Sequence, residues 1–499
     1  MKLAVIGLDG AAFELIDPWI KEGVLPNMKK VKEKGVWGDQ LSVLPPVTSP
    51  NWKAFATGKN PGKLGIFWWE NIDFEKKKVY YPKERKFQHK EIWDHLDENG
   101  YKVGVLGMPT TYPPHEVNGF FVSSGPDAAD TGFTYPEELE KRLKNKYNMK
   151  VRPDVFIRSN PDRAAREIHK IIEGQFDAGL TLAKEYDVDF LQLTIFHINV
   201  LQHFFWNDDK TKKGWEIIDE KVGEILDTAD NVLFMSDHGC NKIEHVFNIN
   251  TWLEREGYLK TKRSFGDILK ALHIDRELLA KISDRLHLQK FLRKVLPPSL
   301  IEGIPTDSGE VKKEGKTSKV DWENSQVFAS GQGPIYFNKN NIEDTEKLKK
   351  EIIKKLENLR HPETNKKIVD KVFRKEEIYE GEYLDEAPDL VMDQARGIHI
   401  AGGLGKEGVF QFSEKWKAEN KKYGIFAAIG EDVERSGEIK GVSILDLAPT
   451  IIDYFGIKIP KDIDGKTLDI FSTKLTPDKK KMGSEETKKI EDALKDISI

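Results

Sequence analysis

The sequence predicts an α/β fold in which helices cover both faces of a mostly parallel central sheet. Short, continuously apolar runs alternate with segments that have the spacing of amphipathic helices. An apolar run without polar alternation is typical of a strand that is buried on both faces, as in a parallel sheet. The runs assigned to the sheet are Leu3–Leu8, Val103–Met108, Phe190–Phe196 and Asn231–Met235.

Helical segments separate these runs. We predict one helix over Pro18–Lys34 and a second over the amphipathic stretch Pro161–Tyr186. A third helix is expected to have Pro50 in its first turn and to stop at Gly58, because proline favours helix starts and glycine favours helix ends. Strand and helix therefore alternate through the first half of the chain, as in other α/β folds.

Residues 261–319 interrupt this pattern. Apolar residues recur there at roughly helical spacing until Pro297-Pro298, and a polar stretch follows. We predict a discontinuous domain over 1–260 and 320–475, a helical insertion or linker over 261–319, and a charged tail over 476–499. The segments expected to return to the sheet system after the insertion are strand-like Ser325–Ala329 and Gly333–Phe337, a helix over Asp344–Leu359, and strand-like Asp389–Met392.

The composition excludes several functional classes. The 499 residues carry 78 basic and 83 acidic side chains, and a net charge of −5 gives no electrostatic case for binding a nucleic-acid polymer. The single cysteine, Cys240, excludes an intrachain disulfide framework and a cysteine-rich zinc site. No run of about 18 apolar residues occurs, so we expect no membrane span and a cytoplasmic location.

Polar residues follow each of the predicted strands. In an open α/β sheet, ligands gather beyond the carboxyl ends of the strands, so these residues are expected to meet at one edge of the sheet. They are Asp9, Pro109-Thr110, the stretch from His197 to His203, and Ser236-Asp237-His238.

Two of these segments are candidate metal ligands. Asp237 and His238 are adjacent after a clear strand, and a carboxylate with an imidazole suits zinc, manganese or iron. Asp9-Gly10 can offer a third ligand at a neighbouring strand end. The structural alternatives are a surface turn for Asp237-His238 and a helix-capping turn residue for Asp9.

Thr48 is the candidate nucleophile. It lies just ahead of a predicted helix N-terminus, where backbone N–H groups and the helix dipole favour an anion. A threonine hydroxyl is a weak nucleophile that needs a base or a metal ion to ionise it. The alternative is that Thr48 or Ser49 only caps the helix. Taken together with Asp9, Asp237 and His238, Thr48 instead indicates a nucleophile generated by a metal ion.

These segments resemble the type I phosphodiesterase/nucleotide pyrophosphatase family of the alkaline phosphatase superfamily. The resemblance extends nearly from end to end and rests on the order and spacing of short motifs rather than on any one of them. The motifs are Asp9-Gly10, Thr48-Ser49-Pro50-Asn51, Thr57-Gly58 with Pro61, Gly107 to Pro113, Ser236-Asp237-His238-Gly239, Phe247 to Leu253, Gly257-Tyr258-Leu259, Ala387 to Val391, Leu445 to Thr450, and Asp464-Gly465.

The resemblance implies an alkaline-phosphatase-like catalytic domain with a two-metal site. One ion would be held by Asp9, Asp237 and His238 and would touch Thr48, while Asn51 would donate to a phosphate oxygen. Thr48 would attack phosphorus to give a phospho-threonine, and water activated at a second ion about 4 Å away would release the phosphate. The implied reaction is the hydrolysis of a phosphodiester or of a nucleotide pyrophosphate bond.

The second metal position departs from the family pattern. The family places Asp-x-x-x-His after a strand, whereas this chain has Asn199 four residues before His203. It also has Asn420 where a late histidine is expected. We therefore expect a divalent metal cofactor, zinc or manganese, with one firm site and a second site that is weak, altered or empty. His197 and His399 are the residues that could compensate.

Two alternatives to hydrolysis stay open. The first is a mutase-type phosphotransferase of the same superfamily, which would pass the phosphate to a second hydroxyl rather than to water. The second is a weakly active or non-catalytic homologue that binds a phosphorylated ligand. In each case the expected partner is a small phosphorylated molecule, and neither a nucleic-acid polymer nor a membrane.

Overall fold

A computed structural model describes residues 1–262 and 319–476, apart from 74, 75, 77, 81, 83, 156, 407, 414 and 415. The helical insertion predicted over 261–319 and the charged tail predicted over 476–499 lie outside the described residues, except for the residues at their borders.

Among the described residues, the main sheet has ten strands, with β1 and its neighbours at its centre. The strand order is β20-β2-β19-β9-β1-β8-β5-β6-β7, and β21 pairs with β2. β1 runs parallel to both β8 and β9, while β19 and β7 run antiparallel to their neighbours. The strands are β1 Leu3–Leu8, β2 Val36–Leu41, β5 Val103–Met108, β6 Gly119–Ser123, β7 Thr134–Tyr135, β8 Phe190–Ile195, β9 Asn231–Met235, β19 Tyr423–Gly430, β20 Gly437–Glu438 and β21 Val442–Ser443.

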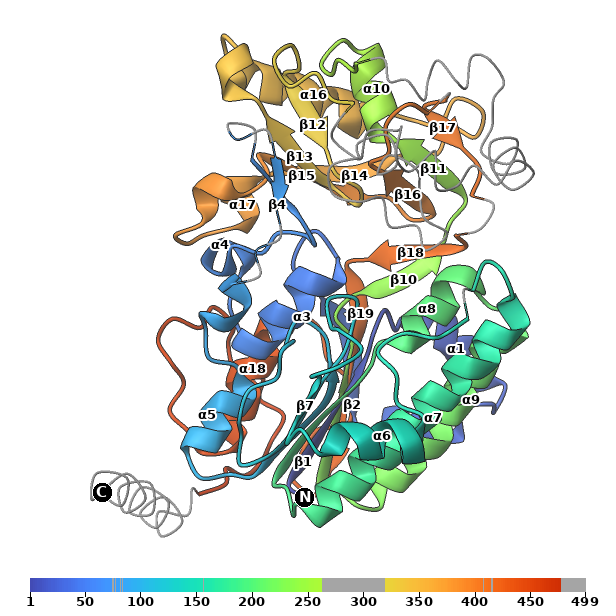
Figure 1. Ribbon diagram of the computed structural model, residues 1–499, viewed down its shortest axis with the longest axis vertical. Helices are drawn as coiled ribbons and strands as arrows, with labels where there is room; N and C mark the ends of the chain where they lie inside the picture. Colours follow the sequence, from blue (N-terminus) through green and yellow to red (C-terminus); the bar gives the residue numbers. More distant parts are fainter. Residues whose placement is uncertain are drawn as a thin grey trace, which may run out of the picture.

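Helices pack against both faces of this sheet, which confirms the predicted fold class (Figure 1). One face is covered by α1 Phe13–Lys21, α2 Pro26–Lys34, α6 Leu139–Tyr147, α7 Pro161–Glu185, α8 His197–Phe204 and α9 Asp209–Leu226. The other is covered by α3 Thr48–Thr57, α5 Ile92–Glu98 and α18 Leu447–Tyr454.

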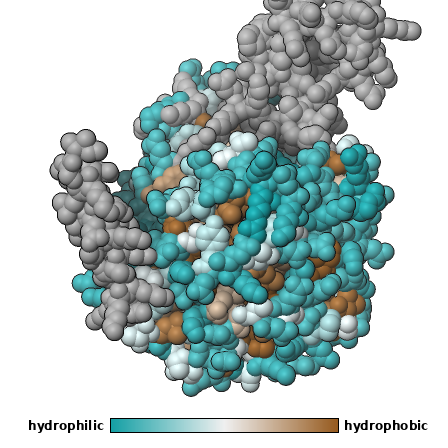
Figure 2. All heavy atoms as spheres, turned by 60° about the horizontal axis from the view of Figure 1, so that its bottom comes forward, coloured by the Kyte–Doolittle hydropathy of each residue, from teal (hydrophilic) through white to brown (hydrophobic). Residues whose placement is uncertain are grey.

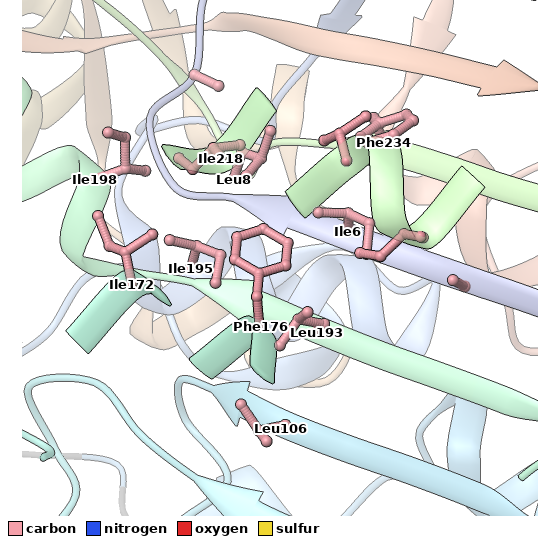
Figure 3. Close-up of a cluster of buried hydrophobic side chains, with 14 of the residues drawn as sticks. Ile6, Leu8, Leu106, Ile172, Phe176, Leu193, Ile195, Ile198, Ile218 and Phe234 are labelled. Carbon is pink, nitrogen blue, oxygen red and sulfur yellow. The ribbon is translucent and has the colours of Figure 1, made fainter. Parts of the chain in front are cut away.

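Alternation along β1 builds these two cores, because successive side chains of a strand point to opposite faces. Ile6 and Leu8 pack in the cluster beneath α7 and α9, where Figure 3 shows them together with Phe176 and Ile218. Leu3 and Val5 pack in the opposite cluster. Both faces of β1 are therefore fully buried, which explains its unbroken apolar run.

A second lobe is built on separate small sheets (Figure 1). Its strands are β12 Val327–Ala329, β13 Pro334–Phe337, β15 Leu390–Gln394 and β14 Val369–Arg374, followed by β16 Ile398–Ala401, β11 His245–Asn248 and β17 Phe410–Gln411. Helices α10 Ile249–Arg255 and α16 Thr345–Asn358 pack with them around a core of their own.

This arrangement corrects one expectation. Strand-like Ser325–Ala329, Gly333–Phe337 and Asp389–Met392 do not rejoin the main sheet; they pair antiparallel with one another in the second lobe. An apolar run shows that a strand is buried but does not show which sheet it joins. From the later part of the chain, β19, β20 and β21 return to the main sheet, and α18 returns to its cover.

Short elements connect the two lobes. The antiparallel pair of β10 Gly239–Lys242 and β18 Ala418–Lys421 lies between them (Figure 1). The remaining short elements of the described residues, some of which lie within one lobe, are α4 Pro61–Leu64, β3 Asn71–Asp73, β4 Lys78–Tyr80, α17 Lys375–Ile378 and the 3-10 turns Glu84–Phe87, Lys339–Asn341, Leu384–Glu386 and Ile444–Asp446.

The helix predicted over Pro18–Lys34 is two helices. α1 begins earlier, at Phe13, and ends at Lys21, and α2 begins at Pro26. Gly23 separates them with a φ of 78°, a left-handed conformation that glycine adopts without strain. The other predicted helix ends agree closely, since α7 covers Pro161–Glu185.

One face of the molecule shows the character of its surface. Figure 2 shows one face, on which hydrophilic residues predominate and apolar ones are scattered. Among the described helices, none is both long enough and apolar enough to cross a membrane.

Gly7 of β1 tests how tightly the sheet packs against α3. A Cβ at Gly7 would lie 2.6 Å from the ring of Trp52 and 3.1 Å from the Thr194 hydroxyl. We predict that Gly7→Ala lowers the free energy of unfolding by about 1–3 kcal/mol, because overpacking forces these neighbours to move. Urea unfolding measures the loss. Gly331→Ala is the control, since its Cβ would meet only ordinary contacts at 3.4 and 3.5 Å; equal effects of the two substitutions would contradict the prediction.

Candidate active site

The centre of the site is a pair of buried carboxylates at the carboxyl ends of neighbouring strands. Asp9 follows β1 and Asp237 follows β9, and both side chains are fully buried. His238 is equally buried, with its Nε2 3.1 Å from Asp237 Oδ2 and 3.9 Å from Asp9 Oδ1. One nitrogen or oxygen atom from each of the three lies within 4.8 Å of the others. The structure thus brings together the three predicted ligands.

Hydrogen bonds fix the orientation of both carboxylates. Trp52 of α3 donates its indole N–H to Asp9 Oδ2 at 2.9 Å, and Asn199 of α8 donates its amide to Asp9 Oδ1 at 2.7 Å. The backbone N–H of Gly10 donates to Asp237 Oδ1 at 3.1 Å. Asp237 Oδ2 has no hydrogen-bond partner within the described residues. An unpartnered, buried carboxylate oxygen beside an imidazole nitrogen fits a cation.

Burial sets the protonation of this centre. It raises the pKa of Asp237 to about 7. Burial and the charge of Asp237 raise the pKa of Asp9 well above its ordinary range. Burial also lowers the pKa of His238, against the opposing charge of Asp9, which favours the neutral imidazole. Two carboxylates that resist ionisation together beside an imidazole would suit a divalent ion, whose charge would reverse the acid shifts.

Thr48 faces this centre. It is the first residue of α3, and its Oγ1 lies 3.3 Å from His238 Nε2. The N-cap of α3 is Val47, and no side chain caps the helix. The capping alternative for Thr48 and Ser49 is therefore not what the structure contains. A hydroxyl at the first turn of a helix lies where backbone N–H groups favour an anion.

Asn51 lies one turn further along α3 but is turned into the preceding loop. Its amide donates to the carbonyls of Val43, Pro45 and Val47 at 3.0–3.2 Å, and its Oδ1 accepts from the Val43 N–H at 2.8 Å. With its hydrogen-bonding groups used in this way, Asn51 fixes the loop that presents Thr48. This placement supports a positioning role and differs from the phosphate contact that the resemblance implies.

The residues predicted for a second metal position lie beside the centre. The side-chain amide of Asn199 donates a hydrogen bond to Asp9. His203 has Nδ1 2.7 Å from the Ala418 carbonyl, and its ring stacks on Trp416 at 4.1 Å. Burial lowers the pKa of His203 to about 4. Asn420 of β18 is buried, and its Oδ1 has no hydrogen-bond partner within the described residues.

Of the two compensating histidines, one lies in this neighbourhood. His399 of β16 contacts the buried carboxylate of Glu419 in an ion pair. His197 is the first residue of α8, and its Nδ1 has no hydrogen-bond partner among the described residues. Burial lowers the pKa of His197 to about 4, against a weaker raising contact with the backbone at Val151. These contacts place His197 with the neighbouring loop.

Sequence reasoning missed Trp52, Glu419 and Gln332. Trp52 follows Thr48 by four residues, a spacing that places both on one face of a helix and could have identified it. Gln332 donates to Glu419 Oε1 at 2.8 Å. Burial alone would raise the pKa of Glu419, but His399 holds it below its ordinary range. Nothing in the sequence links Gln332 to Glu419, because Gln332 lies in the turn between β12 and β13 whereas Glu419 lies on β18.

The fold and this site define a metal-dependent hydrolase of the alkaline phosphatase superfamily. A sequence model of the type I phosphodiesterase / nucleotide pyrophosphatase family matches residues 3–424, and the chain belongs to that family. Metal-dependent hydrolysis of a phosphate ester is therefore its class of activity.

Solved structures agree on the fold. Two structures of phosphonoacetate hydrolase from Sinorhizobium meliloti 1021, one in complex with phosphonoformate and one with phosphonoacetate, are similar to this chain. Each has a TM-score of 0.57 and 14% sequence identity, covering 91% of this chain and 95% of the other. No curated protein matches the sequence.

Trp52→Phe tests the support of Asp9. The change removes the N–H that is donated to Asp9 Oδ2 while keeping an aromatic ring in the core. We predict that zinc or manganese affinity falls by about 10–100-fold, because outer hydrogen bonds orient metal ligands. Titration calorimetry measures the affinity. Trp93→Phe is the matched control, since Trp93 is fully buried and its Nε1 has no partner among the described residues; an equal loss there would attribute the effect to packing alone.

Metal affinity should also depend on pH through Asp237. Its pKa in the metal-free protein is raised to about 7, so the carboxyl carries a proton below that pH. An ion must displace this proton, and apparent affinity should therefore fall about tenfold per pH unit below 7 and level off above it with respect to this group. Calorimetric titrations between about pH 5.5 and 8 measure it. An affinity independent of pH across this range would be the contrary result.

Proposed function

We propose that this protein hydrolyses phosphodiesters or nucleotide pyrophosphate bonds through a phospho-threonine on Thr48. The observation that supports this best is the 3.3 Å approach of Thr48 Oγ1 to His238 Nε2, beside two buried carboxylates and at a helix N-terminus. A hydroxyl in such a place has both a means of ionisation and a site for the anion that it attacks.

Each group of the centre has a separate task. Asp9, Asp237 and His238 would hold a divalent ion, zinc or manganese, that favours ionisation of the Thr48 hydroxyl and neutralises phosphoryl oxygen charge. The Thr48 oxygen forms a bond to phosphorus as the bond to the leaving oxygen breaks. Asn51 fixes the loop from which Thr48 attacks. Water then attacks the phospho-threonine, releasing the phosphoryl group and restoring the hydroxyl.

The family supports phosphodiesters and pyrophosphates as the substrate class. The proposed partner is a small phosphorylated molecule, and the single cysteine supports the cytoplasm as the location. A mutase-type transfer would use the same phospho-threonine but release it to an acceptor alcohol. Product analysis with and without such an alcohol separates transfer from hydrolysis.

Thr48→Ala tests the nucleophile. With manganese or zinc present, we predict a loss of at least about 1,000-fold in the hydrolysis of an aryl phosphodiester, because no other group replaces the attacking oxygen. Thr48→Ser should retain part of the rate. Ser49→Ala is the control, since Ser49 is an equally buried neighbouring hydroxyl. Mass spectrometry of acid-quenched enzyme should find phosphate on Thr48. Hydrolysis that survives Thr48→Ala, or a wild-type protein that binds phosphate esters without turnover, would refute the proposal.

A further inference from the structure

We infer that this centre holds a single divalent ion in place of the family's two, and that the Asn199 amide occupies the side of Asp9 that would otherwise face a second ion. The inference rests on the proposed metal site but not on the proposed substrate. It assigns Asn199 as a positioning residue for Asp9.

The orientation of Asn199 is fixed by its partner. Its Nδ2 lies 2.7 Å from Asp9 Oδ1. Once a bound ion holds Asp9 in its ionised form, that carboxylate can only accept, so the amide nitrogen and not the oxygen faces it. The oxygen side of the Asn199 amide is tightly packed against Gly10, since a Cβ on Gly10 would lie 2.4 Å from Asn199 Oδ1. Gln202, which donates to the Gly10 carbonyl at 2.9 Å, encloses this edge further. Asn199 therefore presents N–H groups, which repel a cation, at the position where the family has a carboxylate.

The remaining donors do not make up the loss. His203 alone keeps the arrangement of a ligand, because its Nδ1 donates to the Ala418 carbonyl and leaves Nε2 free to accept. Asn420 offers one neutral carbonyl oxygen. The buried carboxylate of Glu419 is already engaged by His399 and Gln332. Within the described ranges, the only group of three acidic, cysteine or histidine side chains close enough to share an ion is Asp9, Asp237 and His238.

The balance of charge in the site also favours a single divalent ion. Asp9 and Asp237 carry two negative charges when ionised, which one divalent ion neutralises. A second divalent ion would add two more positive charges to this buried site. Among the described neighbours of His203, the one further carboxylate is that of Glu419, and it is already paired with His399. An uncompensated buried charge is costly. The exchange of a carboxylate for Asn199 thus removes the second ion together with the charge that it would have balanced.

Counting ions tests the inference. The full chain is purified, equilibrated with excess zinc or manganese, desalted, and its metal content measured by plasma mass spectrometry. We expect one ion per chain in the wild type. Asn199→Asp combined with Asn420→His restores the family's ligand types and should bind two. The control pair, Asn199→Ala with Asn420→Ala, loses the same amides without gaining a ligand and should stay at one, with an affinity about tenfold weaker or more.

Each outcome decides the matter. Two ions in the wild type, or a single ion in the Asn199→Asp, Asn420→His variant with an unchanged circular dichroism spectrum, overturns the inference. If that variant fails to fold, Asn199→Asp alone is counted, and no gain in bound metal overturns it as well. Two ions with active hydrolysis refute the inference while leaving the proposed function intact. No bound ion and no hydrolysis refute the proposed function itself.

Discussion

Two buried carboxylates held side by side are the constraint on which the rest of this site depends. Parallel pairing of β1 with β9 places Asp9 and Asp237 at adjacent strand ends, and neither has a lysine or arginine beside it among the described residues. Burial of like charges without a counter-ion is costly, and the raised pKa values of both acids record that cost. A divalent ion removes it, so metal binding should stabilise the sheet edge as well as enable the chemistry.

The backbone around this pair is held from several directions. Gln40 and Ser42 of the β2 region donate to the carbonyls of Ser236 and Asp237, and the Ser236 hydroxyl accepts from the Ile425 N–H of β19. These contacts tie the end of β9 to both β2 and β19. Positions fixed to this degree suit a centre in which small displacements of catalytic groups lower rates strongly.

The sequence predicted the central parallel strands β1, β5, β8 and β9, but neither the outer strands of the main sheet nor the pairing of the second lobe, for physical reasons. Those central strands are buried on both faces and have unbroken apolar runs, and their ends placed Asp9 and Asp237 at the predicted edge of the sheet. The second lobe is built from strands of two to six residues in small sheets, and such runs do not specify their partners. Glu419 was missed because its neighbours, His399 and Gln332, are brought to it only by tertiary packing.

The distribution of these residues separates two tasks. Asp9, Asp237 and His238 follow strands β1 and β9 of the main sheet, and Thr48 and Asn199 lie on its covering helices α3 and α8, whereas Asn420 lies on β18 between the lobes. Glu419 lies on the strand pair between the lobes and accepts a hydrogen bond from the Gln332 amide. The oxygen of the same Gln332 amide accepts from the Trp68 indole N–H at 3.1 Å. This chain of polar contacts connects the second lobe to the edge of the centre. Substitutions in the second lobe can thus reshape the surroundings of the reaction while β1, β9 and α3 keep the reacting groups in place.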